Sequence, residues 1–419
     1  MKQDSIIRNG WPEKAEEIIY NPRRHSARKT RSYLFNQVIP YIGNKRKLLP
    51  LIYDAIRATD ACGGTFFDVF SGSGVVSRLA KTLGFRVISN DWEPYSFHIN
   101  TAFIRCNRQP NFQALGIDHD EVFKTLNNAE PLEGYITAHY CPSDDSKPDP
   151  RNERMFFTRE NGMRIDAMRE MIEDWWRKSL ISNLEKSYIL GPLIYSVSYV
   201  SNTSGVFKAY HQGWGGSTRT ALYRILSRVD VRPPVLYDNG HENIVLCENA
   251  LEILPEIEAE ITYIDPPYNQ HQYGSNYHLL NTVALWDKPP LNRKVIVGGK
   301  TVNKSAIRLD WRNERKSLFC YRETALDEME KVLELTRSRW VLVSYSTDGI
   351  IPADKLLELA SAYGLIEVKA ESYKRYRVSS QRYSPRPRTV EYVVILRRSG
   401  IPSSAREGIR LIERLKTER

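Results

Sequence analysis

The sequence has few of the features that mark secreted, membrane-spanning or metal-binding proteins. Its 419 residues include five cysteines, an odd number, and none forms a CxxC pair, so neither a disulfide framework nor a zinc ribbon is indicated. No apolar run approaches the ~18 residues of a membrane span. The first residues lack an apolar signal-type segment, and the eight histidines show no HExxH spacing. We expect a metal-free protein of a reducing cytoplasm with no membrane partner.

Charge and length leave room for a nucleic-acid partner and for more than one domain. Lys and Arg total 60 against 50 Asp and Glu, which gives a net charge of +10. This excess favours a polyanion, nucleic acid before membrane, although a basic housekeeping enzyme would explain it equally well. The 41% hydrophobic content supports a large core without disulfides. The length fits two or three domains, or one large domain with insertions.

Hydrophobic patterning predicts an α/β core interrupted by a long helical segment. Strands are expected at 65–70, 86–89, from 244, at 261–264, 340–345, 365–368 and 392–396. Between about 100 and 240 this rhythm is lost, and helices are expected at 153–178 and 184–197. The expected parts are a basic arm (1–32), two parts of the core (33–100 and 241–400), the insertion (101–240) and a helical tail (401–419).

A glycine-rich turn follows the first predicted strand. It spans Asp68 to Gly74, and glycines there let the backbone approach a ligand at the carboxyl end of the strand. The spacing is neither the GxGxxG of a dehydrogenase nor a P-loop, since no GK[ST] follows. Asp91 ends the next strand, where a carboxylate can accept hydrogen bonds from ribose hydroxyls. A tight structural turn remains an alternative for the glycines alone.

A second and more specific motif follows the strand at 261–264. It reads Asp265-Pro266-Pro267-Tyr268. Two prolines remove two N–H donors and fix φ near −65°, which predicts a rigid loop with exposed carbonyls. The Asp265 carboxylate and the Pro266 carbonyl can accept both hydrogens of a planar amine, and the Tyr268 ring can stack on its plane. The alternative is a proline-rich turn that only terminates the strand.

Taken together, these motifs resemble the Dam-like, or D12 class, DNA adenine-N6 methyltransferases. The resemblance covers about 39–100 and 244–396, with motifs at 41–45, 70–74, 247–250 and 265–268. The motif order, with the insertion before the catalytic motif, is similar to the family's alpha arrangement. This resemblance implies a Rossmann-like methyltransferase fold with a mixed, mostly parallel sheet and flanking helices. It also makes the mainly helical insertion a target-recognition domain.

The resemblance further implies S-adenosylmethionine as methyl donor, adenine in duplex DNA as acceptor, and no metal. The target base would be flipped out of the duplex and methylated by direct displacement. Catalytic roles fall on Asp265, Pro266, Pro267 and Tyr268. Cofactor contacts fall on Tyr41, Lys45, Asp68, Phe70, Ser71, Gly72, Ser73, Gly74, Asp91, Asn249 and Asp265, although the family often carries Asp at the position of Asn249.

Candidate DNA contacts come from the insertion and from the region after the catalytic motif. They are Lys208, Arg219, Tyr273, Asn276, Arg293 and Lys300. Phosphate contacts from basic residues would provide non-specific affinity, while exposed solvated charges are the plain alternative. His271 and His278 are weak candidates for proton transfer, since the amino proton can leave to water.

The family resemblance also gives expectations about the cell. We expect a bacterial or archaeal nucleoid-associated enzyme of the cytoplasm that acts as a monomer, either in a restriction–modification system or alone in marking DNA and in replication control. Any cognate restriction endonuclease would be a separate chain. Three alternatives stay open. The same fold could act on cytosine N4, RNA or a protein glutamine; the chain could be an inactive DNA-binding relative; or, distantly, it could transfer hydride.

Overall fold

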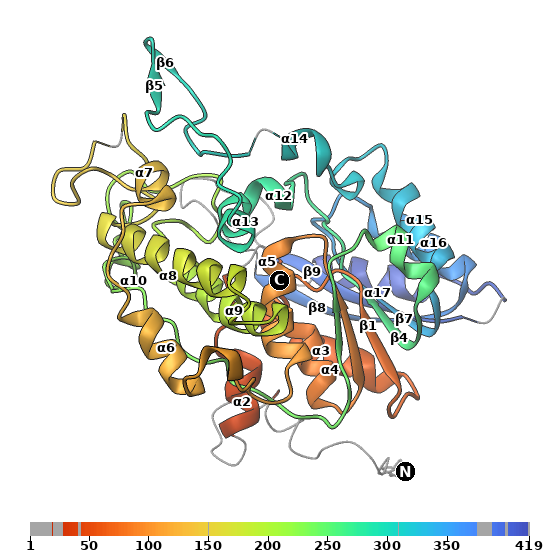
Figure 1. Cartoon of the computed structure of the whole chain (residues 1–419). Coiled ribbons are helices and arrows are strands. Elements are labelled where there is room, and N and C mark those ends of the chain that lie inside the picture. Colours follow the sequence, from red (N-terminus) through yellow and green to blue (C-terminus); the bar gives the residue numbers. More distant parts are fainter. Residues whose placement is uncertain are drawn as a thin grey trace.

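The molecule is organised around one seven-stranded sheet (Figure 1). The computed structural model describes residues 19, 28–40, 43–149, 151–308, 310–374, 388–398 and 401–417. Most of the predicted basic arm therefore lies outside the described residues. Among those that are described, no helix is both long and apolar enough to cross a membrane.

The strands of the sheet run in the order β3-β2-β1-β4-β7-β9-β8. They span β1 Thr65–Asp68, β2 Arg86–Asn90, β3 Ile244–Leu246, β4 Glu258–Ile264, β7 Arg337–Ser346, β8 Gly364–Lys374 and β9 Arg388–Arg398. Within this sheet β9 runs antiparallel to both of its neighbours, β7 and β8, whereas the β1–β2, β1–β4, β2–β3 and β4–β7 pairings are parallel. The prediction of a mixed, mostly parallel sheet with flanking helices is confirmed.

Apolar side chains alternate between the two faces of the sheet, and helices cover both. Phe66 of β1 packs in one core with α3 and α4, and Phe67 packs in another with α15 and α16. The covering helices are α2 Arg28–Phe35, α3 Leu49–Ala58, α4 Val75–Thr82, α11 Ala250–Ile253, α15 Ala325–Leu335, α16 Ala353–Ala362 and α17 Arg406–Thr417. The result is a three-layer α/β sandwich.

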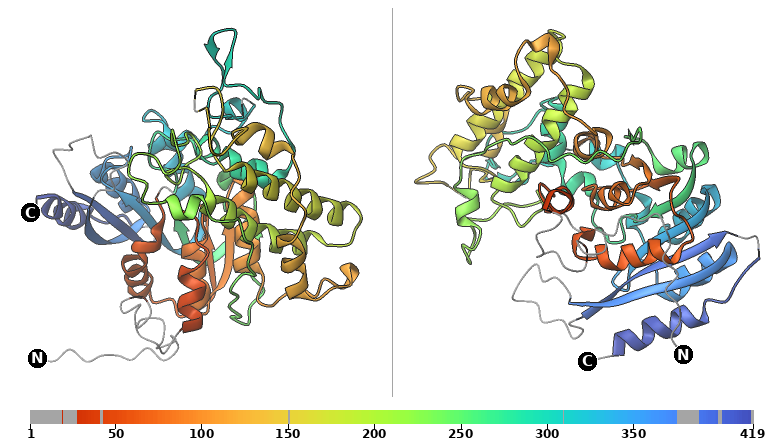
Figure 2. Two further views of the ribbon diagram at one scale, coloured as in Figure 1. Left: turned by 90° about the vertical axis from the view of Figure 1, so that its left-hand side faces the viewer. Right: turned by 90° about the horizontal axis from the view of Figure 1, so that it is seen from below.

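A separate hydrophobic core holds a second group of helices together. The view from below shows these helices beside the sheet (Figure 2). Its elements include α5 Pro94–Asn100, α6 His119–Asn127, α7 Tyr135–Tyr140, α8 Arg159–Arg177, α9 Asn183–Val200, α12 Tyr273–Asn276 and α13 His278–Leu285. The short helix α10 Leu222–Ile225 lies against α9. Leu279, Leu280 and Val283 of α13 belong to this core although they follow the catalytic motif. The helical part therefore draws on chain from both sides of 101–240; the predicted domain boundaries stay a prediction.

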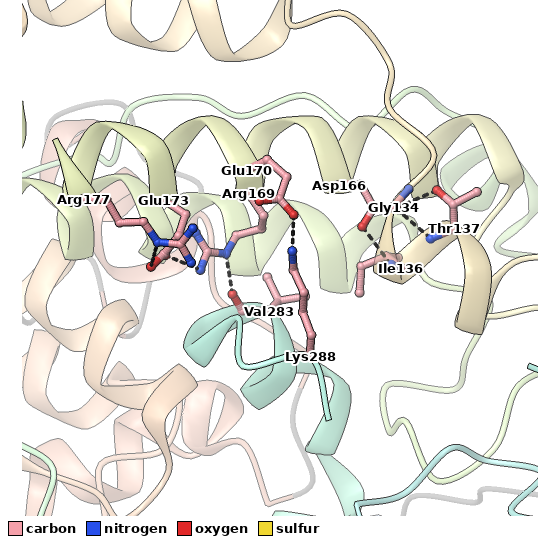
Figure 3. Close-up of polar contacts among 10 residues, drawn as sticks. All are labelled: Gly134, Ile136, Thr137, Asp166, Arg169, Glu170, Glu173, Arg177, Val283 and Lys288. Atoms are coloured by element: carbon pink, nitrogen blue, oxygen red, sulfur yellow. Dashed lines mark hydrogen bonds and ion pairs between the residues drawn. The ribbon is translucent and has the colours of Figure 1, made fainter. Parts of the chain in front are cut away.

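Capping residues set where the two long helices begin. The Thr158 side chain accepts a hydrogen bond from the Asn161 N–H, so α8 starts at Arg159 rather than at the predicted residue 153. Ser182 and Glu185 form a reciprocal capping box at the start of α9. On α8, the buried Arg169 donates through Nε to the Val283 carbonyl of α13, at 2.7 Å (Figure 3). Within the helical part, this contact joins α8 to the segment after the catalytic motif.

The region that follows α13 contains a small projecting hairpin. Its strands are β5 Ile296–Val297 and β6 Lys300–Thr301, and α14 Trp311–Glu314 comes after it. The hairpin stands out from the rest of the chain in two perpendicular views (Figures 1 and 2).

Candidate active site

The two sequence motifs meet at the point where the strand order reverses. β1 lies between β2 and β4, and Asp68 at its end pairs with Tyr263, two residues before Asp265. Open α/β sheets bind ligands in the crevice outside the carboxyl ends of such strands. A cavity of about 340 Å³ opens there, and both motifs line it.

Positive φ angles shape the glycine turn at the cavity. Gly72 has φ +50° and Gly74 has φ +74°, conformations that glycine adopts without strain. A Cβ on Gly74 would lie 2.0 Å from Asn100 Oδ1, so no larger side chain fits without movement. The turn leads directly into α4, whose first residues Val75 and Val76 line the cavity.

Asn90 and Asp91, at the end of β2, hold the surrounding loops in place. Asp91 accepts from the backbone N–H of Gly72 at 2.7 Å and of Glu93 at 2.9 Å. The Asn90 amide donates to the Val69 and Glu248 carbonyls, each at 3.1 Å. Asn90 also lines the cavity. In the sequence, its position next to Asp91 was the one feature that pointed to it as a site residue.

Three buried acids of β1 and of the segment after β2 make the cavity electronegative. Burial raises the pKa of Asp68 to about 7, of Asp91 to about 6 and of Glu93 to about 7. Asp68 Oδ2 accepts from the Ser77 hydroxyl at 2.7 Å, whereas its buried Oδ1 has no hydrogen-bond partner among the described residues. The Glu93 carboxyl accepts from the Asn281 amide. This arrangement suits a cationic ligand that donates hydrogen bonds.

Asp265 of the proline loop is paired with a lysine from the start of the chain's α/β core. Lys45 Nζ lies 3.0 Å from Asp265 Oδ1 and 4.8 Å from the centre of the Tyr268 ring. Burial raises the pKa of Asp265 to about 6, and the Lys45 ammonium opposes that rise. Burial alone would lower the pKa of Lys45, but the neighbouring Asp265 carboxylate raises it well above its usual value. Lys45 therefore stays charged.

The Tyr268 ring is fixed by neighbours on both sides. Its backbone carbonyl accepts from the Ile350 N–H at 2.9 Å, and its ring lies 5.6 Å from that of Tyr345. Gly43 passes so close that a Cβ there would lie 3.1 Å from the Tyr268 hydroxyl. The ring is therefore held at the cavity wall, with Lys45 over it.

A segment after α14 closes part of the cavity, and sequence reasoning missed it. The Gln272 side chain exchanges two hydrogen bonds with the backbone of Ser317, at 2.8 and 3.0 Å. The Phe319 ring meets the Phe70 ring edge-on at 5.4 Å, and Arg315 donates to the Trp92 carbonyl at 2.8 Å. No short motif marks this segment, because its partners are far away in the sequence.

A comparison with protein families agrees with this geometry. The family model for "D12 class N6 adenine-specific DNA methyltransferase" matches residues 41–337, which is most of the chain. The chain belongs to the D12 class.

Curated relatives of this D12-class chain are restriction-system methylases. It is 32% identical to the modification methylase LlaI of Lactococcus lactis subsp. lactis, over 85% of this chain and 54% of that protein. It is 33% identical to the type II methyltransferase M.FokI of Planomicrobium okeanokoites, over 82% and 49%. It thus spans about half the length of these two. The match to M.NlaIII of Neisseria lactamica, at 29% identity, covers 86% of this chain and 99% of that protein.

The structure gathers most of the predicted site residues of this D12 member around one cavity. Those that line it are Lys45, Asp68, Phe70, Ser71, Gly72, Ser73, Asp91, Asn249, Asp265, Pro266, Pro267 and Tyr268. The Asn249 side chain also caps α11 by accepting from the Leu251 N–H at 3.1 Å, a task that Asn and Asp perform equally well. Tyr41 lies outside the described residues. Their roles in binding and catalysis stay predictions.

The predicted DNA contacts do not share one environment. Lys208, Arg219, Arg293 and Lys300 are exposed, and Tyr273 lines the cavity. Asn276 is 2% exposed, and its carbonyl accepts from the Phe207 N–H, so its present position is inside the protein.

The two histidines near the catalytic loop also differ in environment. His271 is exposed. His278 is buried against the Phe207 carbonyl, and burial lowers its pKa to about 4. His278 is therefore placed as a neutral core residue.

Proposed function

We propose that the chain transfers a methyl group from S-adenosylmethionine to the N6 amino group of adenine in duplex DNA. The observation that carries this proposal is the Asp265–Tyr268 loop at the reversal of strand order, facing the same cavity as the glycine turn. The loop offers acceptors and an aromatic face to a planar amine, while the turn and its acids suit a cationic nucleotide-like donor.

The residues present fit that donor. Among the described residues, the buried Asp68 Oδ1 has no hydrogen-bond partner, and Asp91 lines the same cavity. We assign the donor's hydrogen-bonding groups to Asp68, Asp91 and the turn at Ser71–Gly74, with Asn249 toward its base. When bound, S-adenosylmethionine supplies an electrophilic methyl group on a positively charged sulfur.

The catalytic loop would then position the amine. Asp265 and the Pro266 carbonyl accept its two hydrogens, which favours a more tetrahedral and more nucleophilic nitrogen. The Tyr268 ring stacks on the flipped base, and Lys45 keeps Asp265 ionised as an acceptor. Catalysis rests mainly on this positioning, with the released proton passing to water.

The names of the relatives support a biological setting. We infer that the chain modifies DNA in the nucleoid of a bacterial or archaeal cytoplasm as part of a restriction–modification system. It would act as a monomer, with any cognate endonuclease on a separate chain.

The test is expression in a methylation-free bacterial host, followed by single-molecule sequencing of the host DNA. N6-methyladenine at one recurring short sequence is the expected result. Asp265→Ala should abolish it, whereas Glu358→Ala, an exposed acid of α16 that does not line the cavity, should leave it intact. N4-methylcytosine would favour the cytosine alternative, and no modified base from soluble protein would contradict the proposal.

A further inference from the structure

The β5–β6 hairpin has a free tip. Ile296 pairs with Thr301 and Val297 with Lys300, and Gly298-Gly299 form a two-residue turn with φ of +58° and +75°. Both glycines and Lys300 are exposed, and Val297, a large apolar residue, is 50% exposed. The residues of the tip are therefore exposed to solvent, and burial in a hydrophobic core does not account for the hairpin.

The base of the hairpin, in contrast, is held rigidly by one arginine. Arg154 is 1% exposed, and its guanidinium donates to the Asn292 carbonyl at 2.8 Å on the incoming arm. On the outgoing arm it donates to the carbonyls of Asn303 at 3.0 Å and Lys304 at 3.2 Å. A fork of five fixed donors can hold two chain segments in one geometry. The tip is therefore projected in a fixed direction.

The hairpin carries charge of one sign only. Residues 292–304 include Arg293, Lys294, Lys300 and Lys304 and no acidic residue. No ion pair between any of these four and another described residue is present, whereas Glu133, Glu170 and Asp287 elsewhere in the chain each pair with another cation. Uncompensated cations on a projecting arm attract a polyanion.

The hairpin is also continuous with the loops beside the catalytic motif. Ser305, just beyond it, donates through its hydroxyl to the Lys208 carbonyl. The neighbouring Phe207 N–H donates to the Asn276 carbonyl at 2.7 Å, and Asn276 ends α12 in the segment that follows the catalytic loop. A ligand over the active site would therefore extend toward the hairpin along one surface.

We propose that the β5–β6 hairpin is a DNA-contacting arm that enters a groove of the duplex next to the target base. This inference rests on the proposed function. The major groove, about 12 Å wide, admits a two-stranded β-ribbon. The glycine turn makes the tip narrow, Val297 offers an apolar contact to base edges, and the basic residues reach the flanking phosphates.

The test compares the full chain with the double variant Val297→Ser/Lys300→Glu. Fluorescence anisotropy with a labelled 30-base-pair duplex of mixed sequence measures affinity between low and moderate salt. We expect Kd to rise about tenfold, and the slope of log Kd against log salt to fall by about 1 for each phosphate that the variant no longer neutralises. Calorimetric affinity for S-adenosylmethionine should be unchanged, which shows that the variant is folded.

Lys355→Glu is the matched control, because it changes the net charge equally on α16, an outer helix of the sheet. It should leave DNA affinity within about twofold. If the wild type methylates DNA and the hairpin variant binds and methylates DNA equally well, the hairpin proposal is overturned and the proposed function stands. If the wild type methylates no DNA, the proposed function fails instead. Weakened binding confined to the hairpin variant supports the arm; unchanged DNA binding with loss of a protein partner would contradict it.

Discussion

Lys45 acts on the catalytic loop from a motif that the sequence assigns to the cofactor. The two sites are separated by 220 positions, yet Nζ of Lys45 and Oδ1 of Asp265 lie 3.0 Å apart. A lone buried carboxyl in this position would hold its proton to higher pH and lose its capacity as an acceptor. Lys45 therefore supports the ionised form that the proposed mechanism needs.

Replacing this lysine should move the pH dependence of methyl transfer. With a pKa of about 6 for Asp265, the wild-type rate falls as the pH drops through that value. Lys45→Met removes the ammonium while burial remains, so the pKa rises further and the acid limb shifts upward by about one unit or more. Single-turnover rates from pH 5.5 to 9 at saturating cofactor measure it. Lys47→Met, which removes an exposed neighbouring lysine, is the control. If the acid limb of the pH–rate profile lies at the same pH in both variants, Lys45 does not keep Asp265 ionised.

The individual motifs could be recognised from the sequence because each restricts the backbone of its own few residues. Two adjacent prolines after a strand restrict the backbone whatever surrounds them, and so do glycines at a strand-to-helix turn. The Lys45–Asp265 pair, the Asn90 clamp and the Phe319 contact depend on tertiary structure. No spacing rule connects such residues, so they could be found only from the fold.

At the scale of elements, α7 depends on a carboxylate of α8 (Figure 3). Asp166 accepts from the backbone N–H groups of Gly134, Ile136 and Thr137, at 3.1, 2.8 and 2.8 Å, and from the Thr137 hydroxyl at 2.7 Å. The first N–H groups of any helix lack partners within it. Asp166 therefore provides from another helix the cap that α7 lacks in its own sequence.

Asp166→Ala should destabilise the helical part by about 2–4 kcal/mol, because several buried donors lose their acceptor together. Thermal unfolding of the ligand-free chain would report it. Glu170→Ala, one turn further along α8, removes only a partly exposed pair with Lys288 and should cost less than about 0.5 kcal/mol. Similar losses in the two variants would show that the cap does not stabilise α7.

Strands and long helices followed from periodicity, whereas small elements did not. Buried strands such as β1 and β7 were predicted within a few residues, since both sheet faces are covered. The two-residue strands of the β5–β6 hairpin are too short for a pattern, and the residues that flank them are held by Arg154. The start of α8 was predicted six residues early because the cap at Thr158 was not recognised.

At the scale of the whole molecule, the buried acids of the site lower the free energy of unfolding near neutral pH. Asp68, Asp91 and Glu93 hold protons to higher pH in the folded chain than in the unfolded chain. Below the ordinary carboxyl pKa they impose no ionisation cost on folding. As the pH rises toward 7 the unfolded state alone releases these protons, and the folded state becomes relatively less stable. Buried His98 and His278 have lowered pKa values and act in the opposite sense below about pH 6.5.

The Asp68→Asn variant separates these contributions, because the histidines and other acids are common to both proteins. With a pKa of about 7 for Asp68, the stability advantage of the variant should grow by about 2 kcal/mol between pH 5.5 and pH 8. Thermal unfolding of both ligand-free proteins across this range measures the difference. The same variant should bind S-adenosylmethionine more weakly at pH 8, because it loses the carboxylate assigned to the donor. A difference that stays constant with pH would mean that Asp68 is already ionised in the folded protein at pH 5.5, and that burial does not raise its pKa to about 7.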